Sequence, residues 1–154
     1  LNINFFSIQH EVVYQTSFKI IQDYYLFGVG TKMFREICKE EKYKTYTKLD
    51  GSIDGCQTHS HNTYIQLLTE TGIFGFLFFS MFYLYVLYSI FKKIFKPKKE
   101  YNDYDIIEIF CLLSFLINFW PLMPTGNFFN NWINVLYYIP IAFYLFAKTK
   151  NINN

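Results

Sequence analysis

The stretch GIFGFLFFSMFYLYVLYSIF, residues 72–91, decides how the rest of the chain is interpreted. Its twenty residues carry no charge, and at about 1.5 Å of rise per residue a helix of this length crosses the roughly 30 Å hydrocarbon layer of a bilayer. Composition agrees, because 52% of the 154 residues are hydrophobic, 23% are aromatic and only 17% are charged, with a net charge of +2. A disordered chain or an ordinary soluble domain rarely has such values. We therefore predict a transmembrane helix over residues 72–91.

Two further apolar stretches follow, over residues 106–123 and 128–147. The first has Glu108 near its start, where a carboxylate can reach the membrane interface. The second contains Asn134 and Pro140, which neighbouring helices can accommodate within a bundle. We predict an all-α fold, a polytopic membrane helical bundle with three transmembrane helices.

The positions of the lysines predict the orientation of these spans in the membrane. The segment 92–105 begins KKIFKPKKE, and its lysines are Lys92, Lys93, Lys96, Lys98 and Lys99. Lys148 and Lys150 follow the third span. Because cytoplasmic loops are enriched in lysine and arginine, we assign 92–105 as a cytoplasmic loop and 148–154 as a cytoplasmic tail. The turn at 124–127 and the segment 1–71 are then extracytoplasmic. A polybasic patch that binds lipid is compatible with the same topology.

The outer segment 1–71 is polar and of mixed charge, and it shows neither a signal-peptide pattern nor a fourth span. Apolar residues at spacings of three and four predict an amphipathic helix over 10–27 on the membrane surface, with Val13 or Tyr14, Phe18, Ile21 and Tyr25 on one face. Gly28 and Gly30 end this helix, since glycine accepts a left-handed backbone. We expect a short helix over 32–40 and a loop over 41–58. Because the chain begins at Leu1 with an outer loop, we expect it to be the C-terminal part of a longer membrane protein.

Two histidines and an asparagine, in HSHN at 59–62, directly precede the first span. Histidine can accept and donate a proton near neutral pH, because its unperturbed pKa is about 6.5. Equally, His59 and His61 can be polar residues at the membrane interface, with Asn62 as the N-cap of the next helix. A zinc site would need more ligands, and the available residues have no familiar spacing: Asp54, Cys56 and Cys38. The GVG at 28–30 is not a dinucleotide-binding fingerprint, because Met33 replaces its third glycine and no strand precedes it.

This pattern resembles the O-antigen ligase and polymerase superfamily of bacterial envelope glycosyltransferases. His61-Asn62, nine further residues, then Gly72 and Gly75 match its signature H-N-x9-G-x-x-G. GVGTKMF at 28–34 is similar to the family's G-x-G-x-x-x-F turn, and Glu70 fits the ending E-[TS]-G. The likeness, including the later spans and the lysine-rich inner loop, extends over roughly residues 10–147.

The resemblance implies a glycosyltransferase that needs no metal or other cofactor, a multi-pass protein of the bacterial cytoplasmic (inner) membrane with its active-site loop on the periplasmic face. The donor would be a glycan on undecaprenyl pyrophosphate, and the acceptor a lipid A core, a growing glycan or a protein. His61 matches the essential histidine and would be the general base. His59, Asn62, Gln66 and Glu70 are candidates for binding the substrate or orienting the histidine.

The pyrophosphate leaving group requires cationic or amide donors, of which arginine is the best. Arg35 is the only arginine in the chain, and Lys32 and Lys19 are candidate substitutes. Solvated charges of this kind are common in exposed loops, so the same three residues can equally lack a ligand. We expect the main phosphate-binding arginines to lie upstream of this sequence.

Other interpretations stay open. A transporter or flippase of lipid-linked glycans could use His61 as a proton relay. A translocation path needs polar residues within the spans, however, and the main ones here are Asn118 and Asn134. In a non-catalytic envelope membrane protein, His61 could be replaced without effect. Cys38 and Cys56 would share the oxidising side, where they could form a disulfide. No nucleic-acid partner is expected, because the basic run faces the inner leaflet and lacks an aromatic stacking platform.

Overall fold

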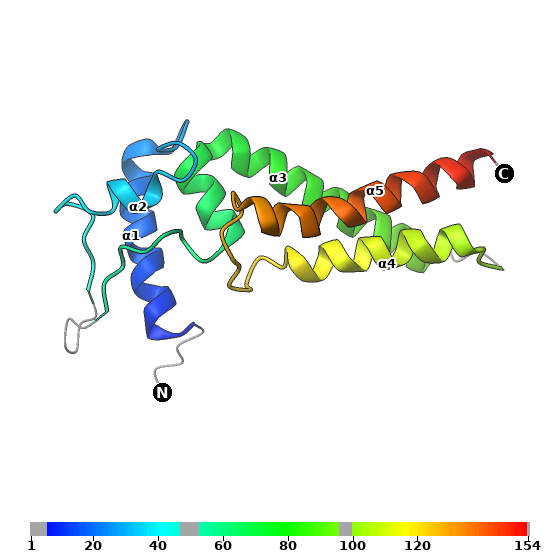
Figure 1. The fold of residues 1–154 in the computed structure, drawn as a ribbon, viewed down its shortest axis with the longest axis horizontal. Helices are drawn as coiled ribbons and strands as arrows, with labels where there is room; N and C mark the ends of the chain where they lie inside the picture. Colours follow the sequence, from blue (N-terminus) through cyan, green and yellow to red (C-terminus); the bar gives the residue numbers. More distant parts are fainter. Residues whose placement is uncertain (1–5, 47–52, 96–99, 154) are drawn as a thin grey trace. The chain divides into compact units, whose positions relative to one another are not determined.

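The computed structural model describes residues 6–46, 53–95 and 100–153 (Figure 1). In these ranges the chain forms five helices: α1 Ile8–Tyr24, α2 Phe34–Ile37, α3 Thr63–Phe95, α4 Asp103–Asn118 and α5 Asn131–Asn153. An isolated bridge between Tyr46 and Asp54 is the only β-type pairing in the described residues. The predicted all-α class is therefore confirmed.

The chain forms two compact units, which we describe separately. Unit 1 comprises Leu1–Phe78 and Pro121–Phe129, and unit 2 comprises Phe79–Trp120 and Asn130–Asn154. The first part of α3 therefore belongs to unit 1 and the remainder to unit 2. The connection between α4 and α5, predicted only as a short outer turn, belongs to unit 1 although both helices belong to unit 2.

Helix α1 is the predicted amphipathic helix, but its buried face differs in part from the prediction. The buried side chains are Val12, Val13, Tyr14, Thr16, Ser17 and Ile20. Phe18 and Tyr25, predicted on the same face, are 52% and 57% exposed. The helix ends at Tyr24, three residues earlier than predicted, because the backbone turns at Gly28, which has a φ of 69° and donates its N–H to the Tyr24 carbonyl at 2.8 Å.

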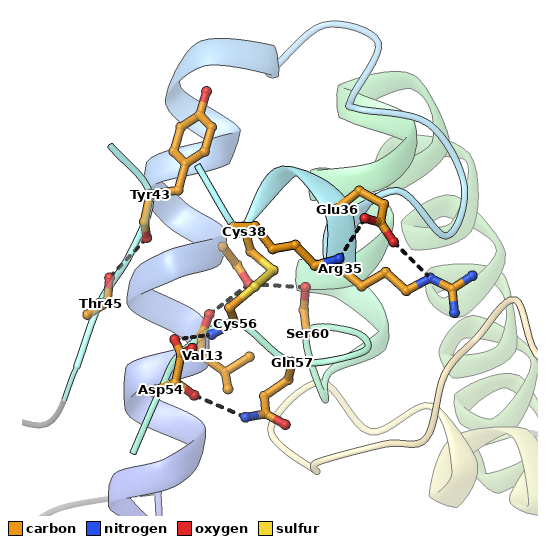
Figure 2. Close-up of a disulfide and its surroundings, with 12 residues drawn as sticks. Val13, Arg35, Glu36, Cys38, Tyr43, Thr45, Asp54, Cys56, Gln57 and Ser60 are labelled. Carbon is orange, nitrogen blue, oxygen red and sulfur yellow. Dashed lines mark hydrogen bonds and ion pairs between the residues drawn. A yellow bond between two sulfur atoms is a disulfide. The ribbon is translucent and has the colours of Figure 1, made fainter. Parts of the chain in front are cut away.

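A small core packs around α2, which is shorter than the predicted 32–40 helix. Its members are Val13, Ile20, Phe34, Cys38 and Tyr43. Cys38 and Cys56 form a disulfide with 5.1 Å between their Cα atoms, and Figure 2 shows it beside α1. Residues 41–46 and 53–58 contain no helix, as predicted for a loop, and 47–52 lie outside the described residues.

Helix α3 contains the predicted first span but begins nine residues before it, at Thr63. Gly72 has φ 67° and ψ −165°, which is not helical, so α3 consists of a short N-terminal helix and a longer apolar one. Among the described helices, α3 is the one that is long and apolar enough to cross a membrane. The predicted spans 106–123 and 128–147 correspond to α4 and α5 with shifted ends, and their transmembrane character stays a prediction.

A capping box marks the start of α4, and a proline follows shortly after its end. The Asn102 side chain accepts a hydrogen bond from the Asp105 N–H at 2.8 Å, and the Asp105 carboxylate accepts one from the Asn102 N–H at 3.2 Å. The helix ends at Asn118, shortly before Pro121, rather than at 123. Of the predicted inner lysines, Lys92 and Lys93 lie in the last turn of α3, while Lys96, Lys98 and Lys99 fall outside the described residues.

In unit 2, α4 and α5 pack directly against each other (Figure 1). The unit 2 part of α3 meets them through long side chains. Phe79 and Phe82 lie edge-on to Phe119 and Phe115, with ring centroids 5.0 and 5.5 Å apart. Contact through large side chains keeps the backbones apart and leaves space between the helices.

We predict that replacing Cys38 by serine lowers the stability of unit 1 by about 3 kcal/mol. The two cysteines are 18 positions apart in the sequence, and a disulfide that closes a loop of this size in the unfolded chain contributes about that much. Thermal unfolding of the purified protein, with and without a reductant, measures this effect. Reduction should lower the midpoint of the wild type and leave the midpoint of Cys38→Ser unchanged. An unchanged midpoint for the reduced wild type would contradict the prediction.

Candidate functional site

Two glycine motifs that are distant in sequence lie against each other in unit 1. The N–H groups of Val29 and Gly30 donate to the carbonyls of Thr69 and Glu70, both at 2.9 Å. The GVG turn thereby satisfies carbonyls at the end of the short helix that carries the histidine motif. For Gly28 and Gly72, the predicted structural role has a physical basis in close backbone approach.

No side chain fits at the centre of this contact. A Cβ atom at Gly28 would overlap the backbone of Glu70, and one at Gly72 would overlap the carbonyl of Leu26. Both glycines also have a positive φ, which other residues adopt at a cost. Gly75 differs, because the three atoms nearest to a Cβ there all belong to the Thr71 side chain of the same helix.

Glu70 is 1% exposed and lies beside the same turn. Its Oε2 accepts a hydrogen bond from the Lys32 N–H at 2.7 Å, and Lys32 has a left-handed φ of 63°. Burial raises the pKa of the Glu70 carboxyl, and the hydrogen bond from Lys32 opposes this shift. The other oxygen, Oε1, is buried without a hydrogen-bond partner among the described residues. Glu70 therefore fixes the turn through Oε2, and the Gln66 side chain and the Phe34 N–H also lower the pKa of its carboxyl.

Asn62 begins the motif helix, as the N-cap interpretation predicted. Its Oδ1 accepts hydrogen bonds from the N–H groups of Tyr64 and Ile65 at 3.0 and 3.2 Å. Its Nδ2 donates to the Pro121 carbonyl at 2.7 Å. Both ends of this buried amide thus have protein partners, and the side chain joins the helix to the 121–129 segment.

The 121–129 segment makes further hydrogen bonds with the motif. The Thr125 N–H donates to the His61 carbonyl at 2.8 Å. Gln66, which is fully buried, donates to the Asn127 side chain and accepts from the Phe128 N–H, both at 2.9 Å. Gln66 therefore holds the segment in place, a role that sequence reasoning did not distinguish from substrate binding.

His61 has a left-handed backbone, with a φ of 52° that is rare for a residue other than glycine. Strained backbone of this kind is found preferentially at functional sites, where surrounding contacts hold it. Here the Thr125 N–H and the Asn62 cap provide those contacts on the C-terminal side of His61.

All three histidines of the chain gather at this position. The His61 ring lies 4.2 Å from the His59 ring and 5.5 Å from the ring of His10 on α1, measured between centroids. His10 was missed by sequence reasoning, because nothing in the local sequence marks it except that histidine is scarce. Among the described residues, no three histidine, cysteine, aspartate or glutamate side chains are arranged to hold a metal ion.

Burial, together with repulsion from a neighbouring histidine, favours the neutral forms of His59 and His61. Desolvation, with a contribution from His61, lowers the pKa of His59 to about 4. Desolvation and the charge of His10 lower the pKa of His61 below its usual value. At neutral pH, His61 is therefore a neutral imidazole that can accept a proton.

Two buried polar atoms near the histidines have no hydrogen-bond partner in the part of the chain that the structure describes. They are Nε2 of His59 and the hydroxyl of Tyr14, whose ring centroid lies 6.2 Å from that of His10. Tyr14 is 7% exposed and was not anticipated as a site residue. Unpaired buried polar atoms are costly, so groups of this kind favour a bound polar ligand or water.

The predicted cationic residues do not converge on the histidines. The Lys19 ammonium donates to the Lys44 carbonyl at 2.8 Å, and the Arg35 guanidinium lies 4.0 Å from Glu36 (Figure 2). Lys32 contributes its backbone N–H to Glu70, and its side chain is exposed. The Lys32 N–H and, to a smaller extent, the charge of Arg35 both lower the pKa of Glu70.

Part of the chain that forms this site matches a known protein family. The family described as O-antigen ligase matches residues 9–80, from the first turn of α1 to the middle of α3. Residues 9–80 of this chain are thus similar to the O-antigen ligase family. No curated protein and no solved structure matched the chain.

The match to the O-antigen ligase family covers the parts of the site that come from α1, the GVG turn and the first part of α3. It includes His10, the GVG turn, the histidine motif and Gly72. The 121–129 segment lies beyond the matched residues, although it binds directly to Asn62 and Gln66.

We predict that Gly28→Ala disrupts this site far more than Gly30→Ala. A Cβ at position 28 overlaps backbone, whereas at position 30 it meets only the flexible Met33 side chain. The left-handed conformation alone costs about 1–2 kcal/mol in either variant, and the overlap should raise the cost for Gly28→Ala to about 3 kcal/mol or more. Thermal unfolding of the two variants tests this difference, and equal midpoints would refute it.

Proposed function

We propose that the protein is a membrane glycosyltransferase of the O-antigen ligase or polymerase type. It transfers a glycan from undecaprenyl pyrophosphate to an acceptor hydroxyl on the outer face of the bacterial cytoplasmic membrane. The family match and the apolar helix α3 support this proposal. The acceptor is a lipid A core, a growing glycan or a protein, and its identity would separate a ligase from a polymerase.

The observation that carries the proposal is the neutral, half-buried imidazole of His61, positioned by a left-handed backbone. A general base must be unprotonated at the working pH and held in place, and the lowered pKa and the hydrogen-bonded backbone of His61 support this role. His59 and His10 border its ring. The Asn62 side chain, which accepts hydrogen bonds from two backbone N–H groups, caps the helix that begins directly after His61.

In the proposed step, the unprotonated His61 nitrogen accepts the proton of the acceptor hydroxyl. The acceptor oxygen forms a bond to the anomeric carbon, and the bond from that carbon to the pyrophosphate oxygen breaks. The leaving group departs as undecaprenyl pyrophosphate with the bonding electron pair. Glu70 Oε1, His59 Nε2 and the Tyr14 hydroxyl are polar atoms of unit 1 that could bind sugar hydroxyls, since all three lack partners among the described residues.

The proposed topology places unit 1 on the outer face. Gly72 marks the entry of α3 into the membrane, and Lys92 and Lys93 mark its cytoplasmic end. Lys148 and Lys150, near the end of α5, are cytoplasmic in the same arrangement. The disulfide between Cys38 and Cys56 agrees with an outer, oxidising location of unit 1.

We predict that His61→Ala abolishes complementation of a strain that lacks the gene, because loss of a general base lowers a rate by roughly 10²–10⁴-fold. Surface polysaccharide and undecaprenyl-linked glycan are measured together. The lipid-linked glycan should accumulate on the outer face, and the polysaccharide ladder then distinguishes ligation from polymerisation.

The control for this experiment is Lys39→Gln, which removes an exposed charge paired with Glu36 in unit 1. It should complement fully, and both variants must reach the membrane in equal amounts with the disulfide formed. Full complementation by His61→Ala would refute the general-base role. Accumulation of the lipid-linked glycan on the inner face would instead favour a flippase.

The pH dependence of the transferase reaction provides a separate prediction. Activity requires neutral His61, so it should fall as the pH drops through the pKa of His61, which lies below the usual 6.5. Because the charge of His10 contributes to this lowering, His10→Gln should move the acid limb to higher pH. Rates measured from pH 4.5 to 8 with wild type and His10→Gln test the shift. An acid limb above pH 6.5 in the wild type would contradict the prediction.

A further inference from the structure

Unit 2 contains a polar cavity of about 400 Å³ between the ends of α3, α4 and α5, distinct from the histidine site of unit 1. Helix α3 meets the other two helices there through long side chains, so the space between the backbones is not filled. Its lining is rich in ammonium and hydroxyl groups, including Tyr85, Lys92, Lys93, Tyr144 and Lys148.

At one side of the cavity, three of these groups form a cluster of hydrogen-bond donors. The Lys148 ammonium donates to the Tyr85 hydroxyl at 2.7 Å, and the Tyr85 and Tyr144 hydroxyls lie 2.8 Å apart. No carboxylate forms an ion pair with Lys148 or Lys92 in the described residues. The cluster therefore presents positive charge and hydroxyl groups that its surroundings do not neutralise.

The acidic residues of the cavity are already engaged. Glu108 pairs with Lys93 at 2.8 Å and accepts a hydrogen bond from the Asn151 amide at 2.9 Å. Asp105 accepts from Asn151 at 3.2 Å and also caps α4. With these contacts made, the side of the cavity formed by Lys148, Tyr85 and Tyr144 favours an anion.

An apolar groove of about 330 Å³ adjoins the polar cavity, and both are lined by Lys93 and Tyr101. The remaining lining of the groove is aliphatic and comes from α3 and α4: Ile90, Ile94, Ile109, Leu112 and Leu113. A polar, cationic cavity next to a hydrocarbon groove matches a molecule that has an anionic head and an apolar chain.

We propose that this part of unit 2 binds an anionic phospholipid. The phosphate occupies the polar cavity beside Lys148, Tyr85 and Tyr144, and an acyl chain lies in the groove along Ile109 and Leu113. Basic cavities between membrane helices at the cytoplasmic side bind lipid headgroups by this combination of charge and hydrocarbon contact. The site is separate from glycosyl transfer, so it can exist whichever reaction unit 1 catalyses.

The test measures binding of phosphatidylglycerol to the full-length protein in mild detergent, by native mass spectrometry or by titration. Lys148→Met keeps the aliphatic stem and removes the charge, and it should weaken binding roughly 5–20-fold. The matched control is Lys150→Met, on the same helix but exposed and away from the cavity, and it should change binding less than twofold. Tyr85→Phe, which removes only a hydroxyl, should weaken binding in the same direction.

Two further probes distinguish the contribution of the lipid headgroup from that of the acyl chain. Phosphatidylcholine, whose headgroup has no net charge, and glycerol 3-phosphate, which has no acyl chain, should both bind at least tenfold more weakly than phosphatidylglycerol. Equal losses in Lys148→Met and Lys150→Met would overturn the proposal in favour of general attraction to a basic surface. Equal affinity for glycerol 3-phosphate would overturn it in favour of a soluble phosphate ester, and equal affinity for phosphatidylcholine would exclude an anionic site.

Discussion

Unit 1 depends on two segments of backbone that approach closely enough to exclude any side chain between them. The GVG turn donates N–H groups to the end of the motif helix, and Gly28 and Gly72 leave the space that this contact requires. Backbone hydrogen bonds at a helix end also satisfy carbonyls that would otherwise be buried without partners. The glycine spacing by which this chain resembles the O-antigen ligase family is thus a condition for joining α1 to α3, independent of chemistry.

Most polar side chains of the motif are committed to structure. Asn62 and Gln66 have all their principal hydrogen-bonding atoms engaged by the chain itself. His61 is different, because its backbone is held while its ring lies among other rings. The division is physically sensible, since a reactive group needs rigid support from neighbours that do not compete for its reactive atoms.

The parts of this architecture that depend on local pattern could be predicted from sequence. Periodicity indicated α1, an uncharged run indicated the apolar part of α3, and motif spacing indicated the family. The rest depends on tertiary contacts. His10 reaches His61 because α1 packs beside the motif, and Phe18 is exposed because Ile20 joins the predicted Val13 on the buried face. The pairing of Cys38 with Cys56 was open for the same reason, since compartment alone permits a disulfide without specifying it.

The histidine motif holds the 121–129 segment in place largely through hydrogen bonds to the main chain of that segment. Asn62 binds the carbonyl of Pro121, the His61 carbonyl binds the N–H of Thr125, and Gln66 binds the N–H of Phe128. The side chains of Leu122 and Met123 are 66% and 51% exposed and take no part in this anchoring. Because every residue type has a main-chain carbonyl and all except proline have an N–H, positions such as Leu122 and Met123 can change in sequence while the segment keeps its place beside the histidine motif.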